Sequence, residues 1–341
     1  MLALRIFLAA LAAVPALCLV TSRAEASKPD KVGYLLTHFY PVEGKEQVYF
    51  HLSKGNDALA YEPLNKDQPV LNSTIGSKSV RDSFIAYNPD ANKYWLIGNN
   101  QSLAGLSGPG SYYQGYDGIV VFDGQDDTLT SWSKPRLLSV AGEGSLHVFA
   151  PEAIWLPSRK EFMLHWSGAY KKDPTQRIYA CYTADFTSCS KPFAYYEEAD
   201  RVGDMSIRKL TDSPHGFVRF WVSNGNDSRI LGQYSENGVR GDWKDILPAE
   251  KPAMSAKGID PASGGSGPLV FQDNIDPRTY YVWIIEGSYE PFETNNIRVL
   301  PYSYVGNHPG FPKDVQQGNV ISVNQKQYDA LKKKWGSAEG K

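Results

Sequence analysis

The sequence repeats one pattern four times, and this repetition limits the possible folds more than any other feature. Each copy has a short polar or Gly/Pro opening, an apolar strand, a turn rich in Asp, Asn, Pro or Ser, and a second strand with a tryptophan. The copies are residues 81–99, 150–168, 203–224 and 265–287. Their tryptophans are Trp95, Trp166, Trp221 and Trp283. Such repetition indicates units that bury their apolar faces against one another.

The two ends of the chain supply a fifth unit. Residues 32–64 resemble the later part of a copy and lack its first strand, which the isolated strand at residues 318–323 would provide. Pairing these segments closes a ring and removes exposed sheet edges. We therefore predict an all-β fold, a five-bladed β-propeller whose ring is closed by the N- and C-terminal strands. Residues 324–336 are expected to form a short helix on its outside. A β-sandwich is the alternative, but four matched hairpins with tryptophan favour the propeller.

Composition supports a folded protein. The hydrophobic share is 42% in a chain of 341 residues, which excludes a disordered chain. A formal net charge of −2 argues against a partner that is a nucleic acid. The repeat predicts one domain over residues 27–341, and we expect a monomer.

The first 26 residues predict a secretory signal peptide. Arg5 gives a positive start, residues 6–20 are apolar, and small residues follow up to Ala26. The apolar stretch is short for a membrane span and Pro15 interrupts it. We therefore expect a secreted, extracellular protein with no membrane anchor.

Cysteine usage agrees with export. Cys181 and Cys189 remain after the signal peptide, eight residues apart across a turn, which predicts a disulfide. Two thiols with no nearby histidine do not form a metal site, so we expect no metal and no other cofactor. Three Asn-X-Ser/Thr triplets are candidate glycosylation sites. They begin at Asn72, Asn100 and Asn226.

Acidic residues recur where the first strand of each copy begins. The residues at these starts are Asp82, Glu152, Asp204 and Ser266. In a propeller they would meet at one mouth of the central channel, where carboxylates raise one another's pKa. Such an arrangement is costly and usually functional. Glycoside hydrolysis is a natural function, because it needs a carboxylate base and a carboxylic acid. The alternative is that Arg81 or strand amides satisfy these groups structurally.

The chain resembles glycoside hydrolase family 43, and most closely its secreted arabinosidase-like branch. Members are five-bladed propellers that act on arabinose- and xylose-containing polysaccharides. The resemblance covers nearly all of the chain after the signal peptide. The segments that carry it are EQVYFHLS, VRDSFIAYNPDANKYWLIGN, FAPEAIWLPSRKEFMLHWSG, QRIYACYTADF, GGSGPLVF and GNVISVNQKQYDAL.

The resemblance implies three catalytic positions. The general base falls on Asp82, and the carboxylate that tunes pKa and orients the sugar falls on Glu152. The general acid of the family, a glutamate before Gly-Pro, falls on Ser266. A serine does not protonate a leaving group as a carboxylic acid does, because it holds its proton too tightly. Relatives sometimes hold a calcium ion in the channel, but the tail QQGNV lacks their histidine, so no ion is expected.

This departure leaves two hypotheses. In the first, the protein is an inverting arabinofuranosidase or xylosidase in which Asp82 activates water and another residue is the acid. Asp204 is the best substitute, because it has the same position one unit earlier than Ser266. Glu143 and Glu286 are weaker candidates.

In the second hypothesis the propeller binds an oligo- or polysaccharide with little or no turnover. Ser266 would then be a binding residue rather than a lost acid. The aromatic loop GSYYQGYDG breaks the repeat, which favours ligand contact there. The tryptophans of the second strands would either stack on sugar or, as we expect from their recurrence, pack between blades. Candidate sugar-binding aromatics are Tyr112, Tyr113, Tyr116 and Trp221. A secreted interaction protein without a sugar ligand has no supporting motif.

Overall fold

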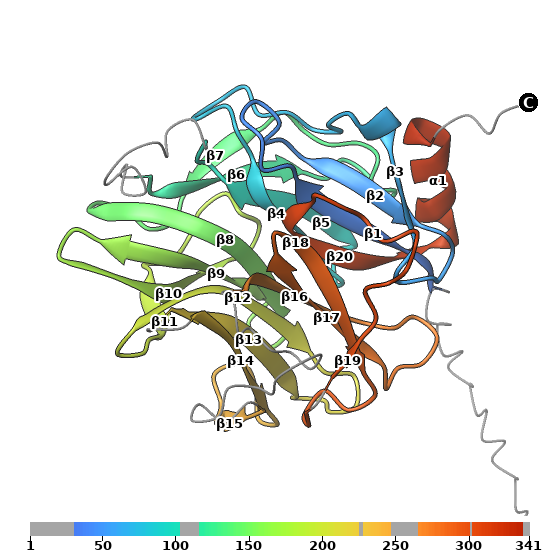
Figure 1. Ribbon diagram of the computed structural model, residues 1–341. Helices are drawn as coiled ribbons and strands as arrows, with labels where there is room; N and C mark the ends of the chain where they lie inside the picture. Colours follow the sequence, from blue (N-terminus) through green and yellow to red (C-terminus); the bar gives the residue numbers. More distant parts are fainter. Residues whose placement is uncertain (1–30, 103–115, 225–227, 247–264, 301, 337–341) are drawn as a thin grey trace, which may run out of the picture. The chain divides into compact units, whose positions relative to one another are not determined.

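The predicted five-bladed β-propeller is confirmed. The computed structural model of the protein describes residues 31–102, 116–224, 228–246, 265–300 and 302–336. Within them the chain forms five four-stranded sheets, arranged as blades in Figure 1. All paired strands within a blade are antiparallel. One strand of each blade contacts its counterparts in the neighbouring blades in a closed circuit, β4 to β8, β12, β16, β20 and back to β4. These five inner strands therefore line the axis.

Four blades take their strands in chain order from the axis outward. The first of them contains β4 (Arg81–Asn88), β5 (Lys93–Asn99), β6 (Gly118–Asp123) and β7 (Arg136–Ser139). The next contains β8 (Ser145–Leu156), β9 (Glu161–Tyr170), β10 (Asp173–Thr183) and β11 (Phe193–Tyr196). The third contains β12 (Arg201–Lys209), β13 (Phe217–Asn224), β14 (Ser228–Ser235) and β15 (Lys244–Asp245). The fourth contains β16 (Ser266–Gln272), β17 (Tyr280–Glu286), β18 (Ser288–Thr294) and β19 (Ser303–Tyr304).

The fifth blade joins the two ends of the described chain, as predicted. Its order is β20, β1, β2, β3, and Figure 1 shows the red β20 beside the blue β1. Leu35 lies opposite Ile321 in this pairing. The strands are β20 (Gln316–Asn324), β1 (Lys31–Phe39), β2 (Tyr49–Ser53) and β3 (Tyr61–Pro63). A single 3-10 turn, η1 (Asn65–Asp67), follows β3.

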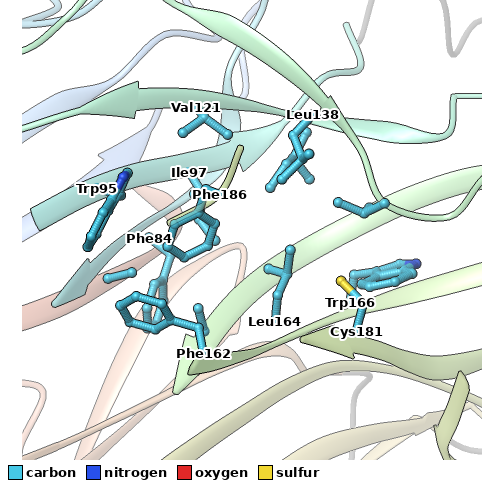
Figure 2. Packing of buried hydrophobic residues seen from close by; sticks show 14 of the residues in the cluster. Phe84, Trp95, Ile97, Val121, Leu138, Phe162, Leu164, Trp166, Cys181 and Phe186 are labelled. Carbon is cyan, nitrogen blue, oxygen red and sulfur yellow. The ribbon is translucent and has the colours of Figure 1, made fainter. Parts of the chain in front are cut away.

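The recurring tryptophans pack between blades. Each of the four second-strand tryptophans is 2% exposed or less. Figure 2 shows the cluster between the β4–β7 and β8–β11 blades, where Trp95 lies near Phe162 and Phe186. The Trp95 and Phe162 rings meet edge to face with centroids 5.5 Å apart. Because both faces of a blade are covered by its neighbours, large apolar side chains on successive strands become buried, and removing one aromatic would cost about 3–5 kcal/mol.

The helix α1 (Gln325–Trp335) ends the described chain and packs against the fifth blade. Asn324 begins it with a capping box, in which Asn324 and Gln327 exchange side-chain-to-backbone hydrogen bonds. Leu331 is fully buried, and Trp335 meets Phe50 of β2 edge to face. The predicted outer helix is thus present, and it stabilises the blade that closes the ring. No helix within the described ranges combines the length and apolarity needed to cross a membrane.

The predicted disulfide is present. Cys181 on β10 is bonded to Cys189, with 5.9 Å between the Cα atoms. Cys181 is completely buried and belongs to the same apolar cluster as Trp95. The bond therefore ties the loop after β10 to the packing between two blades.

Candidate active site

The inner strand of every blade is interrupted by a bulge at the same place. Two consecutive residues there face a single residue of the second strand, which re-aims the first side chain. Four of the bulge residues have positive φ, at 51°, 46°, 48° and 52°. They are, in chain order, Asp82, Ala150, Asp204 and Gly267. For residues other than glycine this conformation costs roughly 1–2 kcal/mol, so the surrounding ring must impose it.

The bulges correct the predicted equivalence of the four strand starts. Asp82 and Asp204 do occupy equivalent positions, but Glu152 lies two residues beyond the bulge residue of β8. Ser266 lies one residue before the bulge residue of β16. The prediction that all four match is wrong, because position within a strand counted from sequence does not allow for an inserted residue. Ala150 and Gly267 are the true equivalents of Asp82 and Asp204, and neither has a carboxylate.

Asp82 is held by two hydrogen bonds. Its side chain is buried, and Oδ2 accepts from Asn99 Nδ2 and from the Ala150 N–H, both at 3.1 Å. Asn99 comes from β5 of the same blade and Ala150 from the bulge of the next. These two donors fix the direction of the carboxylate. The arrangement suits a base.

Asp204 is set up differently. Its own N–H donates to Ser167 Oγ at 2.7 Å, and its Oδ2 accepts from the Gly267 N–H at 3.3 Å. Burial raises the pKa of its carboxyl to about 6, the charge of Asp82 adds to that rise, and Arg81 opposes it. A carboxyl with this pKa still holds its proton in mildly acidic solution, which suits a general acid.

Glu152 is paired with an arginine. It is 5% exposed, and Arg208 Nη1 donates to its Oε2 at 2.8 Å. The Ile207 N–H also points to Oε2, at 3.4 Å. Burial raises the pKa of Glu152, and the Arg208 guanidinium opposes that rise. Arg208 also lies over the Phe84 ring, 5.1 Å from its centroid, so it bridges three blades. Glu152 is therefore part of a structural ion pair.

The three carboxyls converge. Tyr289 is buried, and its hydroxyl accepts from the Gly318 N–H at 3.0 Å. Burial raises the pKa of Tyr289, the Gly318 N–H opposes the rise, and the charges of Glu152, Asp82 and Asp204 all increase it. Residues from β4, β8 and β12 thus lie within electrostatic reach of one tyrosine of β18.

The four aromatic residues predicted to bind sugar have different outcomes. Trp221 is 2% exposed and its Nε1 donates to Glu198 at 3.0 Å, so it is a packing residue and its assignment to sugar binding is wrong. Tyr112 and Tyr113 lie outside the described residues. Tyr116 is partly buried, and its carbonyl accepts from the Ser145 hydroxyl at the start of β8. Among these aromatics, Tyr116 alone stays a candidate with a described position.

The remaining candidate acids, Glu143 and Glu286, lie at the surface, and Ser266 lies at a strand start. Ser266 is partly buried at the start of β16, opposite Ile285. Glu286 follows Ile285 and is exposed, and Glu143 is exposed in the loop before β8. Both acids are exposed, whereas Asp204 is partly buried. Asp204 remains the substitute acid.

The candidate glycosylation sites differ in their exposure. Asn72 is exposed. Asn100 is 6% exposed and its Oδ1 accepts from the Ser77 N–H and hydroxyl, so the prediction for Asn100 is wrong for the folded protein. Asn226 lies outside the described residues. In the described part of the chain, no three His, Cys, Asp or Glu side chains gather as a metal site requires.

Sequence reasoning missed the residues that orient the aspartates. Asn99 and Ser167 are equivalent in the second strands of their blades, opposite Arg81 and Phe149. Each bonds to one of the two aspartates, Asn99 to the side chain of Asp82 and Ser167 to a backbone N–H. A polar residue at the end of an otherwise apolar strand was the available signal.

Comparison with known proteins finds chains of similar sequence and fold. The chain is 19% identical over 224 residues to an α-L-arabinofuranosidase of Bifidobacterium longum subsp. longum, covering 59% of this chain. The match covers 21% of that protein, so the chain spans about a fifth of its length. The family-93 α-L-arabinofuranosidase of Fusarium graminearum, solved with arabinobiose, has a similar fold. Its TM-score is 0.53 at 15% identity, covering 83% of this chain and 81% of that one.

A family model provides the assignment. The model described as a probable glycosyl hydrolase domain, related to glycoside hydrolase family 43, matches residues 30–329. That range includes every blade and all three converging carboxyls. The chain therefore belongs to this family of glycosyl hydrolase domains related to family 43.

Proposed function

We propose that the protein hydrolyses arabinofuranosyl or xylosyl linkages of plant-type polysaccharides with inversion, using Asp82 as base and Asp204 as acid. One observation supports this most: the two aspartates have equivalent bulge positions on β4 and β12, with β8 between them. Their carboxyls are close enough for the charge of Asp82 to raise the pKa of Asp204. The similarity to an arabinofuranosidase supports the sugar class.

The chemistry follows from the two environments. Asp82, held by Asn99 and Ala150, takes a proton from water, and that water attacks the anomeric carbon. Asp204 gives its proton to the departing oxygen. Inverting enzymes need about 6.5–9.5 Å between the two carboxyls, which leaves room for the water. Glu152 acts indirectly, because its ion pair with Arg208 connects β8 and β12.

A second candidate is a glycan-binding propeller without turnover. It is favoured by the absence of a carboxylate at Ser266 and Gly267, where the family resemblance places the acid. Carboxylates and aromatic side chains at the mouth would then bind sugar hydroxyls.

Hydrolysis assays separate these candidates. The purified chain is incubated with aryl α-L-arabinofuranosides, aryl xylosides, arabinan and arabinoxylan. We expect turnover that Asp82→Asn abolishes, while Asp329→Asn, an exposed change on α1, has no effect. Sugar binding in calorimetry without turnover of any substrate would support the second candidate instead.

We also propose that the chain is exported after removal of residues 1–26. The Cys181–Cys189 disulfide supports this, since such bonds persist in oxidising compartments. Expression of the whole chain in a secreting host tests it. Mature protein in the medium beginning at residue 25 or 27 is expected, and retention of the intact chain in the cells would contradict export.

A further inference from the structure

Arg81 has two buried donors without a partner among the described residues, next to the predicted base. It directly precedes Asp82 on β4 and lies opposite Asn99. Its side chain is partly buried, and its guanidinium lies over the Phe39 ring, 5.3 Å from the centroid. Nε and Nη1 are buried and have no hydrogen-bond partner among the described residues. A buried donor left unpaired is costly, so such groups usually have a partner that the protein alone does not provide.

The nearby carboxyls do not pair with Arg81. Asp82 accepts from Asn99 and Ala150, and Glu152 accepts from Arg208. No ion pair within 4.0 Å joins Arg81 to an acidic side chain in the described ranges. The charge of the guanidinium nevertheless lowers the pKa of Asp204, as expected for a group close to the site. In the part of the chain that the structure describes, the Arg81 guanidinium therefore forms no ion pair.

We propose that Arg81 determines specificity by binding a carboxylate of the substrate, so that the preferred glycan carries a uronic acid near the bond that is cleaved. The inference rests on the proposed function, because it takes the mouth near Asp82 and Asp204 as the sugar site. The group recognised is the carboxylate itself, whichever uronic acid supplies it.

The geometry favours a carboxylate over a hydroxyl. Phe39 covers one face of the guanidinium, which leaves the N–H edge for a ligand. Nε and Nη2 lie on the edge of the guanidinium that matches the two oxygens of a carboxylate, and Nε on that edge has no partner among the described residues, whereas one hydroxyl cannot satisfy both. The pair would also neutralise a charge that is costly in a partly buried site. Asp82 repels an anion, but its carboxyl is already directed to Asn99 and Ala150.

The direct test compares two ligands that differ only in the carboxyl. Calorimetry on the full chain measures binding of a glucuronic-acid-substituted xylo-oligosaccharide and of the same oligosaccharide with its carboxyl reduced to an alcohol. We expect the acid to bind about tenfold to a hundredfold more tightly, as for hydrogen bonds to charged groups. The preference should shrink as salt is raised.

Variants of Arg81 test whether this residue causes the preference for the acidic ligand. Arg81→Met should make the two ligands bind equally, and Arg81→Lys should keep part of the difference because the charge remains. Arg159→Met is the matched control, since Arg159 also lies over an aromatic ring, that of Tyr182, at 3.9 Å. Far-ultraviolet circular dichroism and thermal unfolding verify that each variant is folded.

Three results would overturn the inference. They are equal binding of the acid and the alcohol by the unaltered protein, a preference that survives Arg81→Met, and no binding of either ligand at millimolar concentration. Hydrolysis of aryl arabinofuranosides by the unaltered protein is measured in parallel. Turnover without an acid preference rejects the role of Arg81 alone. An acid preference without turnover rejects the hydrolase proposal and keeps the binding role.

Discussion

Asp82 and Asp204 are the bulge residues of two inner strands, and each carboxyl accepts a hydrogen bond from the bulge N–H of the blade that follows it. The donor to Asp82 is Ala150, at 3.1 Å, and the donor to Asp204 is Gly267, at 3.3 Å. Their surroundings otherwise differ, since Asp82 also accepts from Asn99, whereas burial raises the pKa of Asp204 to about 6. Two carboxyls in contrasting environments are typical of an acid and a base.

Replacement of Asp204 should affect substrates according to their leaving groups. Asp204→Asn removes the proton donor but keeps the shape of the side chain. We expect kcat/KM to fall by about a hundredfold or more for natural polysaccharide, the range for general acids. An aryl arabinofuranoside with an acidic phenol should lose far less, because its leaving group needs little protonation. An equal loss on both substrates would contradict the role of acid.

The proton on Asp204 should make stability depend on pH. Its pKa is about 6 in the folded chain and 3.8 ordinarily, so the folded state holds this proton more tightly. The resulting stabilisation is complete below about pH 4 and is lost as pH rises through about 6. It amounts to about 3 kcal/mol of unfolding free energy, at 1.36 kcal/mol per pKa unit. Urea unfolding from pH 4 to 7 measures it.

The Asp204→Asn variant isolates the contribution of Asp204 to the pH dependence of stability. Burial also raises the pKa of Glu152, so both carboxyls act in the same direction. Burial lowers the pKa of His51, His147 and His165, so these histidines act in the opposite direction over the same range. The contribution of Asp204 is therefore read as the difference between the two proteins. Relative to the unaltered chain, Asp204→Asn should gain about 3 kcal/mol of unfolding free energy between pH 4 and 7. An unchanged slope would mean that Asp204 titrates normally in the folded protein.

Removing one member of the Glu152–Arg208 pair should lower the unfolding free energy more than replacing both members. Arg208→Met leaves a buried carboxylate unpaired, which costs about 3–5 kcal/mol of unfolding free energy. The double variant Glu152→Gln with Arg208→Met should recover most of this loss. Urea unfolding of the single and double variants measures the coupling. Additive losses would show that the two side chains do not depend on one another.

The disulfide should stabilise the fold moderately. Cys181 and Cys189 close a short loop, with a sequence separation of 8, for which the chain-entropy estimate is about 2.5 kcal/mol. Cys181→Ala with Cys189→Ala should lower the thermal midpoint, and reductant should then have no further effect. Reductant that lowers the midpoint of the unaltered and double-variant proteins equally would contradict a stabilising bond.

Much of the fold could be predicted from sequence, because it depends on periodic burial. Trp95 and Trp283 are both buried, although they lie at different positions relative to the bulge, since each second strand packs between two blades. The pairing of β20 with β1 was predictable for a similar reason, since a ring needs its missing inner strand. The disulfide was predictable from the spacing of its cysteines.

The site was only partly predictable, because bulges shift register. Asp82 and Asp204 were identified correctly as equivalent. Glu152 and Ser266 were predicted to be equivalent to them, although Glu152 follows the bulge residue of its strand and Ser266 precedes it. Arg208 could not be linked to Glu152 from sequence, because that contact joins residues 56 apart across two blades. Long-range polar contacts of this kind carry no local pattern.

The stereochemistry of the first product tests the central claim most directly. Proton nuclear magnetic resonance follows hydrolysis of an aryl α-L-arabinofuranoside by the unaltered chain, before the product mutarotates. Asp82 acting as base on water, with Asp204 as acid, predicts that β-L-arabinofuranose appears first and that Asp82→Asn forms none. First appearance of the α-anomer, or unchanged turnover by Asp82→Asn, would contradict the account.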